Sequence, residues 1–69
     1  MAQWKILEYL KKQTKPVPRR KIAADLDMNP KQVSKDLRKL MDFRLVSFEY
    51  KYDKEVKKKI WFYFVVPKP

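Results

Sequence analysis

The sequence predicts an α+β fold in which three helices are followed by a β-hairpin. Two observations indicate this order. In residues 2–41, apolar side chains recur with the spacing of amphipathic helices. From residue 45 onward, two runs rich in Val, Phe, Tyr and Trp flank a short polar stretch, as in two strands joined by a turn. Because 69 residues can build only one core, we expect a single domain over residues 1–69.

The first helix is predicted for residues 2–13, with Ile6 and Leu10 on its apolar side. Pro16 prevents the helix from continuing, because a proline moves the preceding residue out of the helical region. Val17 stands between two prolines and is therefore expected to be extended, as an edge strand of one or two residues.

A second helix is predicted to begin at residue 18 or 19 and to end before a turn at residues 27–28. Asn29 and Pro30 favour the start of a third helix. The Asn side chain can accept a hydrogen bond from a free backbone amide, and Pro suits the first helical position. We expect the third helix to run from Pro30 to about Met41.

The two predicted strands are residues 45–52 and 59–66, joined by the polar residues 53–58. The second strand is apolar on both faces. We therefore expect one face to pack on the helices and the other to meet the first helix or a second copy of the chain. The two faces are formed by Ile60, Phe62, Phe64 and Val66 on one side, and by Trp61, Tyr63 and Val65 on the other.

The charge of the chain favours a polyanionic partner. Its net charge is +10, from 18 Lys and Arg residues against 8 Asp and Glu, and nucleic acid is the commonest polyanion in a cell. The chain has no Cys and no His, which excludes a disulfide and an ordinary zinc site and removes the usual bases of catalysis near neutral pH. We expect no catalytic residues, no metal and no cofactor, so the protein is not expected to be an enzyme.

The cellular setting is indicated by features that the sequence lacks. No apolar run is long enough to span a bilayer, and the N-terminus lacks the basic start and apolar core of a secretory signal. We therefore expect a cytoplasmic protein with no membrane or small-molecule partner. The chain also contains no Gly, and its wealth of Lys resembles the composition of heat-adapted proteins, which suggests a thermophilic, archaeal source.

Residues 20–40 have the spacing that two short helices need when they cross at a steep angle. Ala23 is the small residue required where the backbones approach. Asp27 lies four positions later, in the turn. Val33, six positions after Asp27, is expected to pack from the third helix against the second. This spacing is typical of a helix-turn-helix.

The outward face of the third helix is predicted to be basic. With Val33, Leu37 and Leu40 on the inner side, the opposite side collects cations and an amide. Lys and Arg can bind guanine edges or phosphates and Gln can pair with adenine, so this face suits the major groove of duplex DNA. Its residues are Lys31, Gln32, Lys35, Arg38 and Lys39, with Ser34 on one flank and Asp36 on the other.

The stretch 22–40, followed by Leu45 and Val46, resembles the winged helix-turn-helix superfamily. It is similar to small archaeal and bacterial transcription regulators of the multiple-antibiotic-resistance and arsenic-repressor types. The resemblance covers roughly residues 4–66 and implies that the hairpin is a wing, lying on a flanking groove or on the backbone. It also implies a recognition helix carried by Lys31, Gln32, Ser34, Lys35 and Arg38.

The sequence departs from that family at two positions where glycine is usual. These are Asp27 in the turn and Arg44 before the first hairpin strand. Asp tolerates the left-handed backbone moderately well, whereas Arg there costs about 1 kcal/mol. Either the backbone differs at this point or Arg44 is kept for a phosphate contact.

Two further basic clusters favour DNA binding. Lysines at a hairpin tip can touch phosphates or enter the minor groove, although they also prevent aggregation. Cations at the start of a helix oppose its dipole, so their presence there indicates an anionic partner. The tip holds Lys54, Lys57, Lys58 and Lys59, and the second helix starts with Arg19, Arg20 and Lys21.

The aromatic residues suggest a second interface. Trp4 lies on the outer side of the first helix, while Trp61 and Tyr63 lie on one face of the last strand. We expect a homodimer formed through the first helix and this aromatic strand. A stacking platform for single-stranded nucleic acid is an alternative, but a strand that is apolar on both faces is more often covered on both.

These features predict sequence-preferring binding of double-stranded DNA by a small transcriptional regulator that inserts its third helix into the major groove. Three alternatives stay open, because winged helices serve several functions. They are a non-specific chromatin- or replication-associated DNA binder, a protein-interaction module that uses the aromatic strand, and a binder of single strands or RNA.

Overall fold

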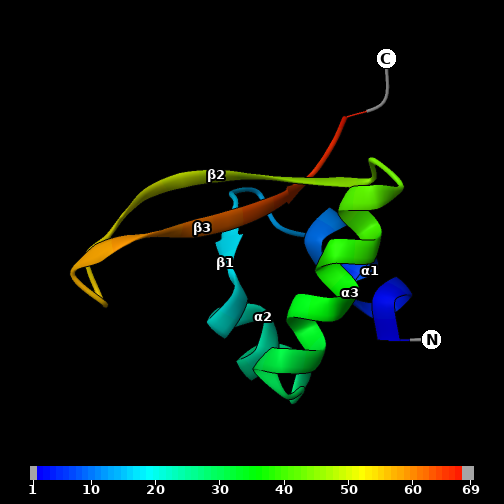
Figure 1. Cartoon of the computed structure of the whole chain (residues 1–69), viewed down its shortest axis with the longest axis horizontal. Coiled ribbons are helices and arrows are strands. Elements are labelled where there is room, and N and C mark those ends of the chain that lie inside the picture. Colours follow the sequence, from blue (N-terminus) through cyan, green and yellow to red (C-terminus); the bar gives the residue numbers. More distant parts are fainter. Residues whose placement is uncertain (1, 68–69) are drawn as a thin grey trace.

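The computed structural model describes residues 2–67 and contains three helices and a three-stranded antiparallel sheet, which confirms the predicted α+β class. The ends of the predicted domain, residues 1 and 68–69, lie outside the described residues. Figure 1 shows the helices gathered at one end of a long hairpin, whose other end projects away from them. Among the described residues no helix is both long and apolar enough to cross a bilayer. The elements are α1 (Ala2–Lys11), β1 (Val17–Pro18), α2 (Arg19–Leu26), α3 (Pro30–Asp42), β2 (Val46–Asp53) and β3 (Lys58–Val65).

Each predicted element is present, with its ends shifted by a residue or two. α1 ends two residues earlier than predicted. The amides of Lys12 and Gln13 bond to the carbonyls of Tyr9 and Leu10, three residues back, and this tighter turn closes the helix. The two hairpin strands are each displaced by one residue from their predicted ranges.

β3 is the central strand of the sheet, with β1 on one side and β2 on the other. Val17 pairs with Tyr63, which confirms the predicted short edge strand. β2 and β3 pair along their whole length, from Val46 opposite Val65 to Asp53 opposite Lys58. The hairpin is therefore a continuous two-stranded arm that begins beside the helices.

A single core joins the helices to the base of the hairpin. Burying one large apolar side chain contributes about 1.5–3 kcal/mol, so this cluster is what fixes the position of α3. Val46 and Tyr63 close the core from the sheet side. The fully buried side chains are Ile6, Ile22, Val33, Leu37 and Leu40.

The face of the hairpin that meets the helices becomes more exposed along its length. Pairing places Phe48, Trp61 and Tyr63 on this face. Tyr63 is only 7% exposed, whereas Phe48 and Trp61 are 42% and 47% exposed. The helices of the same chain leave Trp61 open, because the hairpin extends past them (Figure 1). Cover of Trp61 by a second copy of the chain stays a prediction. Tyr63, which was expected at a dimer surface, belongs to the core.

Three of the residues that the structure describes adopt the left-handed backbone without being glycine. They are Asp27 (φ 54°), Arg44 (φ 60°) and Lys57 (φ 56°). The backbone at Asp27 and Arg44 thus has the conformation that glycine would favour, and Arg44 carries a local cost of about 1 kcal/mol. This conformation turns the chain at the end of α3, and the amide of Leu45 donates a hydrogen bond to the carbonyl of Leu40.

Candidate nucleic-acid interface

α3 is buried along one side and open along the other. Val33, Leu37 and Leu40 have no exposed surface. The helix start is fixed by Asn29, whose side chain accepts a hydrogen bond from the amide of Lys31 at 2.8 Å, as predicted. The side opposite the core is exposed, and it carries Lys31, Gln32, Lys35, Arg38 and Lys39.

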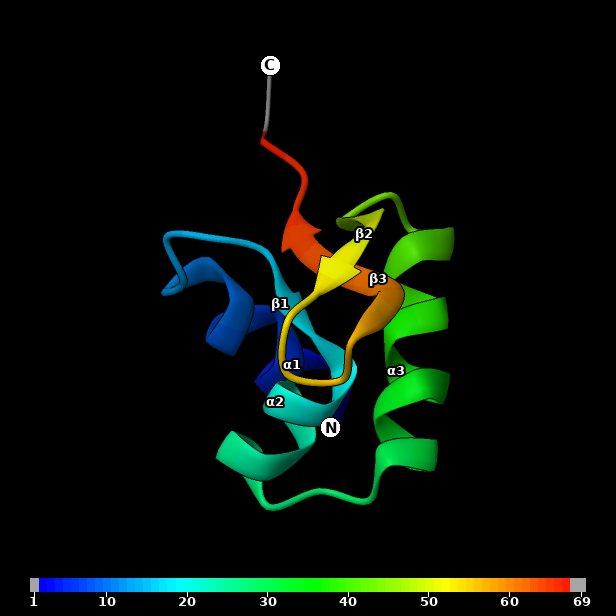
Figure 2. The same ribbon diagram turned by 90° about the vertical axis from the view of Figure 1, so that its left-hand side faces the viewer.

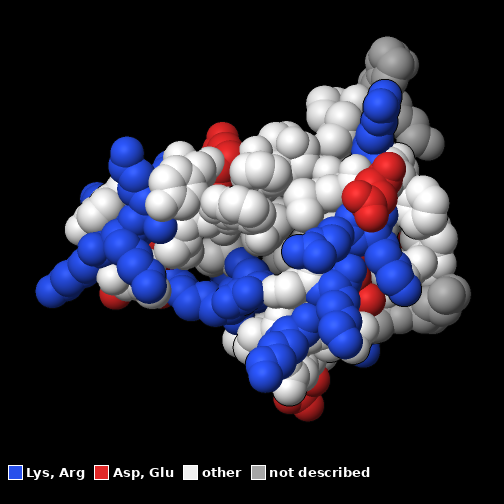
Figure 3. Space-filling view, viewed as in Figure 1, with Lys and Arg blue, Asp and Glu red and all other residues white. Residues whose placement is uncertain are grey.

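The cations of this outer side have no acidic partner. Within residues 2–67, the only Lys and Arg side chains within 4.0 Å of a carboxylate are Lys11, Arg20, Lys21 and Lys51. A cation without a carboxylate partner has no ion pair to break when it binds an external anion. Figure 3 shows basic side chains gathered at the hairpin tip and over α3, with more of them below the hairpin. The unpaired predicted contacts are Arg19, Lys31, Lys35, Arg38, Lys39, Arg44, Lys54, Lys57 and Lys58.

Arg19 and Ser34 are joined, although they lie on different helices. Nη1 of Arg19 donates to Oγ of Ser34 at 2.7 Å. Arg19 and Tyr63 also line the same cleft. Burial raises the pKa of Tyr63, and the charge of Arg19 opposes this rise. Arg19 is therefore held at the junction of α2, α3 and β3.

Gln32 is oriented by a neighbour within α3. Its Nε2 donates to Oδ1 of Asp36 at 3.0 Å, which leaves the amide oxygen and one amide hydrogen for another partner. Asp36 was expected on a flank but is only 4% exposed, and its Oδ2 has no hydrogen-bond partner among the described residues. The sequence did not indicate this burial, because a flank position is covered or open according to its tertiary neighbours.

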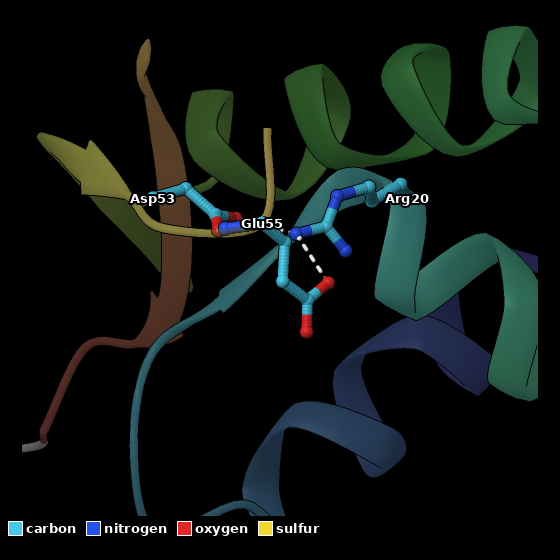
Figure 4. A network of polar contacts seen from close by, with 3 residues as sticks. All are labelled: Arg20, Asp53 and Glu55. Atoms are coloured by element: carbon cyan, nitrogen blue, oxygen red, sulfur yellow. Dashed lines mark hydrogen bonds and ion pairs between the residues drawn. The ribbon is translucent and has the colours of Figure 1, made fainter. Parts of the chain in front are cut away.

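Arg20 was predicted as a DNA contact but is engaged within the chain. Its Nη2 lies 2.5 Å from Oδ2 of Asp53 and 3.0 Å from Oε2 of Glu55. Figure 4 shows the guanidinium reaching from α2 to the end of β2. Desolvation opposes ionisation of Asp53, but the Glu55 amide and the Arg20 charge outweigh it and hold the pKa of Asp53 below its usual range. Arg20 therefore ties the hairpin to α2.

The hairpin tip is a compact turn built without glycine. The amide of Lys57 donates to the carbonyl of Asp53, and the amide of Glu55 donates to the Asp53 side chain, each at 2.8 Å. The predicted contacts Lys54, Lys57 and Lys58 are all exposed here. Figure 2 looks at the tip end-on, with α3 to one side of it and α2 below. The tip and α3 are thus two separate basic projections.

A cleft of about 500 Å³ lies between the start of α2, the side of α3 and β3. The sequence did not indicate it, because its walls come from segments far apart in the chain. The described residues contain no group of three or more His, Cys, Asp or Glu side chains that could hold a metal ion. Cations and aromatic rings line the cleft together with Ser34, among them Arg19, Arg38, Lys58, Trp61 and Tyr63.

The two tryptophans border different hollows. Trp4 is 47% exposed and lines a hollow with Tyr9 and Leu26, whereas Trp61 lines the cleft. These two hollows have no lining residue in common. Arg44 borders a third hollow at the far end of α3. The residues predicted to form a dimer face therefore do not converge on one hollow.

Comparison with known proteins connects the chain to one family. No curated protein and no solved structure gives a significant match. The model of the HVO_A0114 family matches residues 1–64, a range that takes in all three helices and all of β3 except its last residue. The chain therefore belongs to the HVO_A0114 family.

Proposed function

We propose that this protein is a winged helix-turn-helix that binds double-stranded DNA with sequence preference, as a small transcriptional regulator. The observation that carries the proposal is the two-sided character of α3. Its inner side is fully buried, while its outer side presents cations with no acidic partner among residues 2–67. A helix that enters the major groove needs a free outer face that attracts phosphates and reaches base edges.

The arrangement of the other elements supports this assignment. α2 and α3 pack against each other across a short turn at Asp27, which is the layout of a helix-turn-helix. The β2–β3 hairpin follows directly and projects from the helices as a wing does (Figure 1). Arg20 gives this wing a defined position relative to α2 through Asp53 and Glu55.

The outer side of α3 offers both base recognition and phosphate binding. Lys35 and Arg38 lie three residues apart and therefore reach the same stretch of groove. Arg38, like Lys35, suits a guanine edge or a phosphate beside it, and Gln32, oriented by Asp36, suits adenine. Lys31 and Lys39 extend this side towards the two ends of the helix, where they can bind phosphates.

The remaining cations suit the DNA backbone beside this groove. Lys54, Lys57 and Lys58 are exposed at the tip, where the wing of a DNA-bound winged helix meets phosphates or the minor groove. Arg44 is exposed two residues after the end of α3, where it can meet a phosphate. These contacts add affinity without sequence preference, so they support the selectivity of α3 rather than replace it.

A binding-site selection with the purified protein, followed by fluorescence anisotropy, tests the proposal. The selected duplex should bind about 10³-fold or more tightly than a random duplex. A ratio near one would instead favour the non-specific chromatin- or replication-associated binder. Absence of duplex binding at low salt would refute the proposal, and retention of a protein partner in that case would favour an interaction module.

A further inference from the structure

Trp61 forms a stacking surface that is already ordered. Its ring stacks on Phe48 with centroids 4.4 Å apart and planes 14° apart. Its edge meets Tyr63, at 6.5 Å and 68°. Yet the residue is 47% exposed. The indole is therefore fixed by two neighbours while part of it stays open to a ligand, at little further cost in side-chain entropy.

Cations without a carboxylate partner line the same cleft as this ring. The cleft that Trp61 lines is also lined by Arg19, Arg38 and Lys58, none of which has a carboxylate within 4.0 Å among the described residues. Arg19 is held in place by Ser34 at 2.7 Å. The volume of about 500 Å³ lies within the range of roughly 300–1,000 Å³ that is usual for small-ligand sites. The cleft thus combines an aromatic wall with a positive rim.

This combination selects a planar and anionic occupant. A second copy of the chain also carries +10, so the cations of the rim would oppose its approach. Within an intact duplex the faces of the bases are covered by their neighbours. An unpaired nucleotide, in contrast, offers an open base face and a phosphate together, and aromatic stacking with adjacent basic side chains is how proteins hold such nucleotides.

We propose that the cleft binds an unpaired nucleotide adjoining the duplex that α3 holds. The base stacks on Trp61, and its phosphate lies against Arg38 and Lys58. This inference rests on the proposed function, because α3 brings the duplex to the side of the cleft. Duplexes with a single-stranded overhang or an extruded base are then preferred over blunt duplexes.

Three probes with equal numbers of phosphates test this inference by anisotropy: a blunt duplex, a duplex with a thymidine overhang, and a duplex with an abasic overhang. The thymidine overhang should bind more tightly than the other two. Trp61→Ala should weaken binding of the thymidine-overhang duplex by about 5- to 150-fold, the equivalent of ~1–3 kcal/mol for one stacked base. The ratio of its affinity to that of the abasic-overhang duplex should then be close to one. Trp61→Phe should restore part of the preference, and Trp4→Ala, outside the cleft, should retain all of it.

Fluorescence provides an independent readout. In a Trp4→Phe variant Trp61 is the remaining tryptophan, and its emission should be quenched by the thymidine overhang but not by the abasic one. Equal affinity for these two overhangs, or unchanged emission, would overturn the cleft inference while leaving duplex binding intact. Failure to bind any of the three probes at low salt would overturn the proposed function as well. A Trp61-dependent dimer in sedimentation would assign the cleft to a second copy instead.

Discussion

Replacing Lys35 and Arg38 together by alanine removes two unpaired cations from the middle of the outer side of α3. Ten cations belong to the predicted contact set, and Arg20 is the one that pairs with carboxylates, which leaves nine. Each neutralised phosphate contributes about 0.9 to the slope of log K against log salt concentration, so nine contacts set a limit of about −8. The double variant should lower the size of this slope by about 2.

The assay is fluorescence anisotropy of one labelled duplex over a series of salt concentrations, between about 50 and 200 mM. Over this range the affinity of the double variant should fall about tenfold less than that of the wild type, although its affinity at low salt is weaker. Lys5→Ala/Lys12→Ala is the matched control. It removes the same charge from exposed residues that border the Trp4 hollow, and it should leave the slope close to that of the wild type.

The result that would refute this reasoning is an equal loss of slope in both double variants. In that case binding would depend on the net charge of the chain and not on the outer side of α3. An unchanged slope in Lys35→Ala/Arg38→Ala would likewise exclude α3 as the element that meets the phosphates.

Four further predictions concern the structure itself. Arg20→Ala should speed hydrogen exchange of the hairpin-tip amides, because the contacts with Asp53 and Glu55 are lost, whereas Lys21→Ala, which breaks only the exposed pair with Asp25, should not. Since the pKa of Asp53 is lowered by folding, its contribution to stability is present above the unfolded value of about 3.9 and is lost as the pH falls through the folded value. In the Asp53→Asn variant the temperature of thermal unfolding should therefore fall less steeply as the pH is lowered. An unchanged dependence on pH would contradict this. Leu37→Ala should lower the free energy of unfolding in urea by about 2–5 kcal/mol, while Arg44→Gly should raise it by about 1 kcal/mol; a destabilised glycine variant would show that the left-handed backbone is not strained.

The local features of the fold were predictable because they depend on neighbours in the chain. Asn29 followed by Pro30 marked the start of α3, and the structure shows the expected capping bond. The spacing of Val33, Leu37 and Leu40 identified the buried side of this helix and, by subtraction, its exposed basic side. The strands were located within one residue, since alternating and β-branched residues bounded by polar stretches favour a hairpin.

The candidate interface was only partly predictable. Exposure of the basic side chains on α3 and at the tip agreed with the sequence, but the partners of Arg20, Gln32 and Ser34 did not emerge from it. Arg20 and Asp53 are separated by 33 positions, so their contact depends on how the hairpin returns to α2. Residue type alone grouped Arg20 with Arg19, although one cation is paired with carboxylates and the other has none.

The sequence by itself determined the fold class, the order of the elements and the basic side of α3, because hydrophobic periodicity and helix-start signals act over a few residues. Only the tertiary structure decided which of the side chains predicted to be exposed are available to a ligand. Packing placed Tyr63 in the core and buried Asp36, while the length of the hairpin left Trp61 open beside Arg38 and Lys58. The cleft exists because three segments that are distant in the chain pack around one core. A pattern over a few neighbouring residues does not predict contacts between such distant segments.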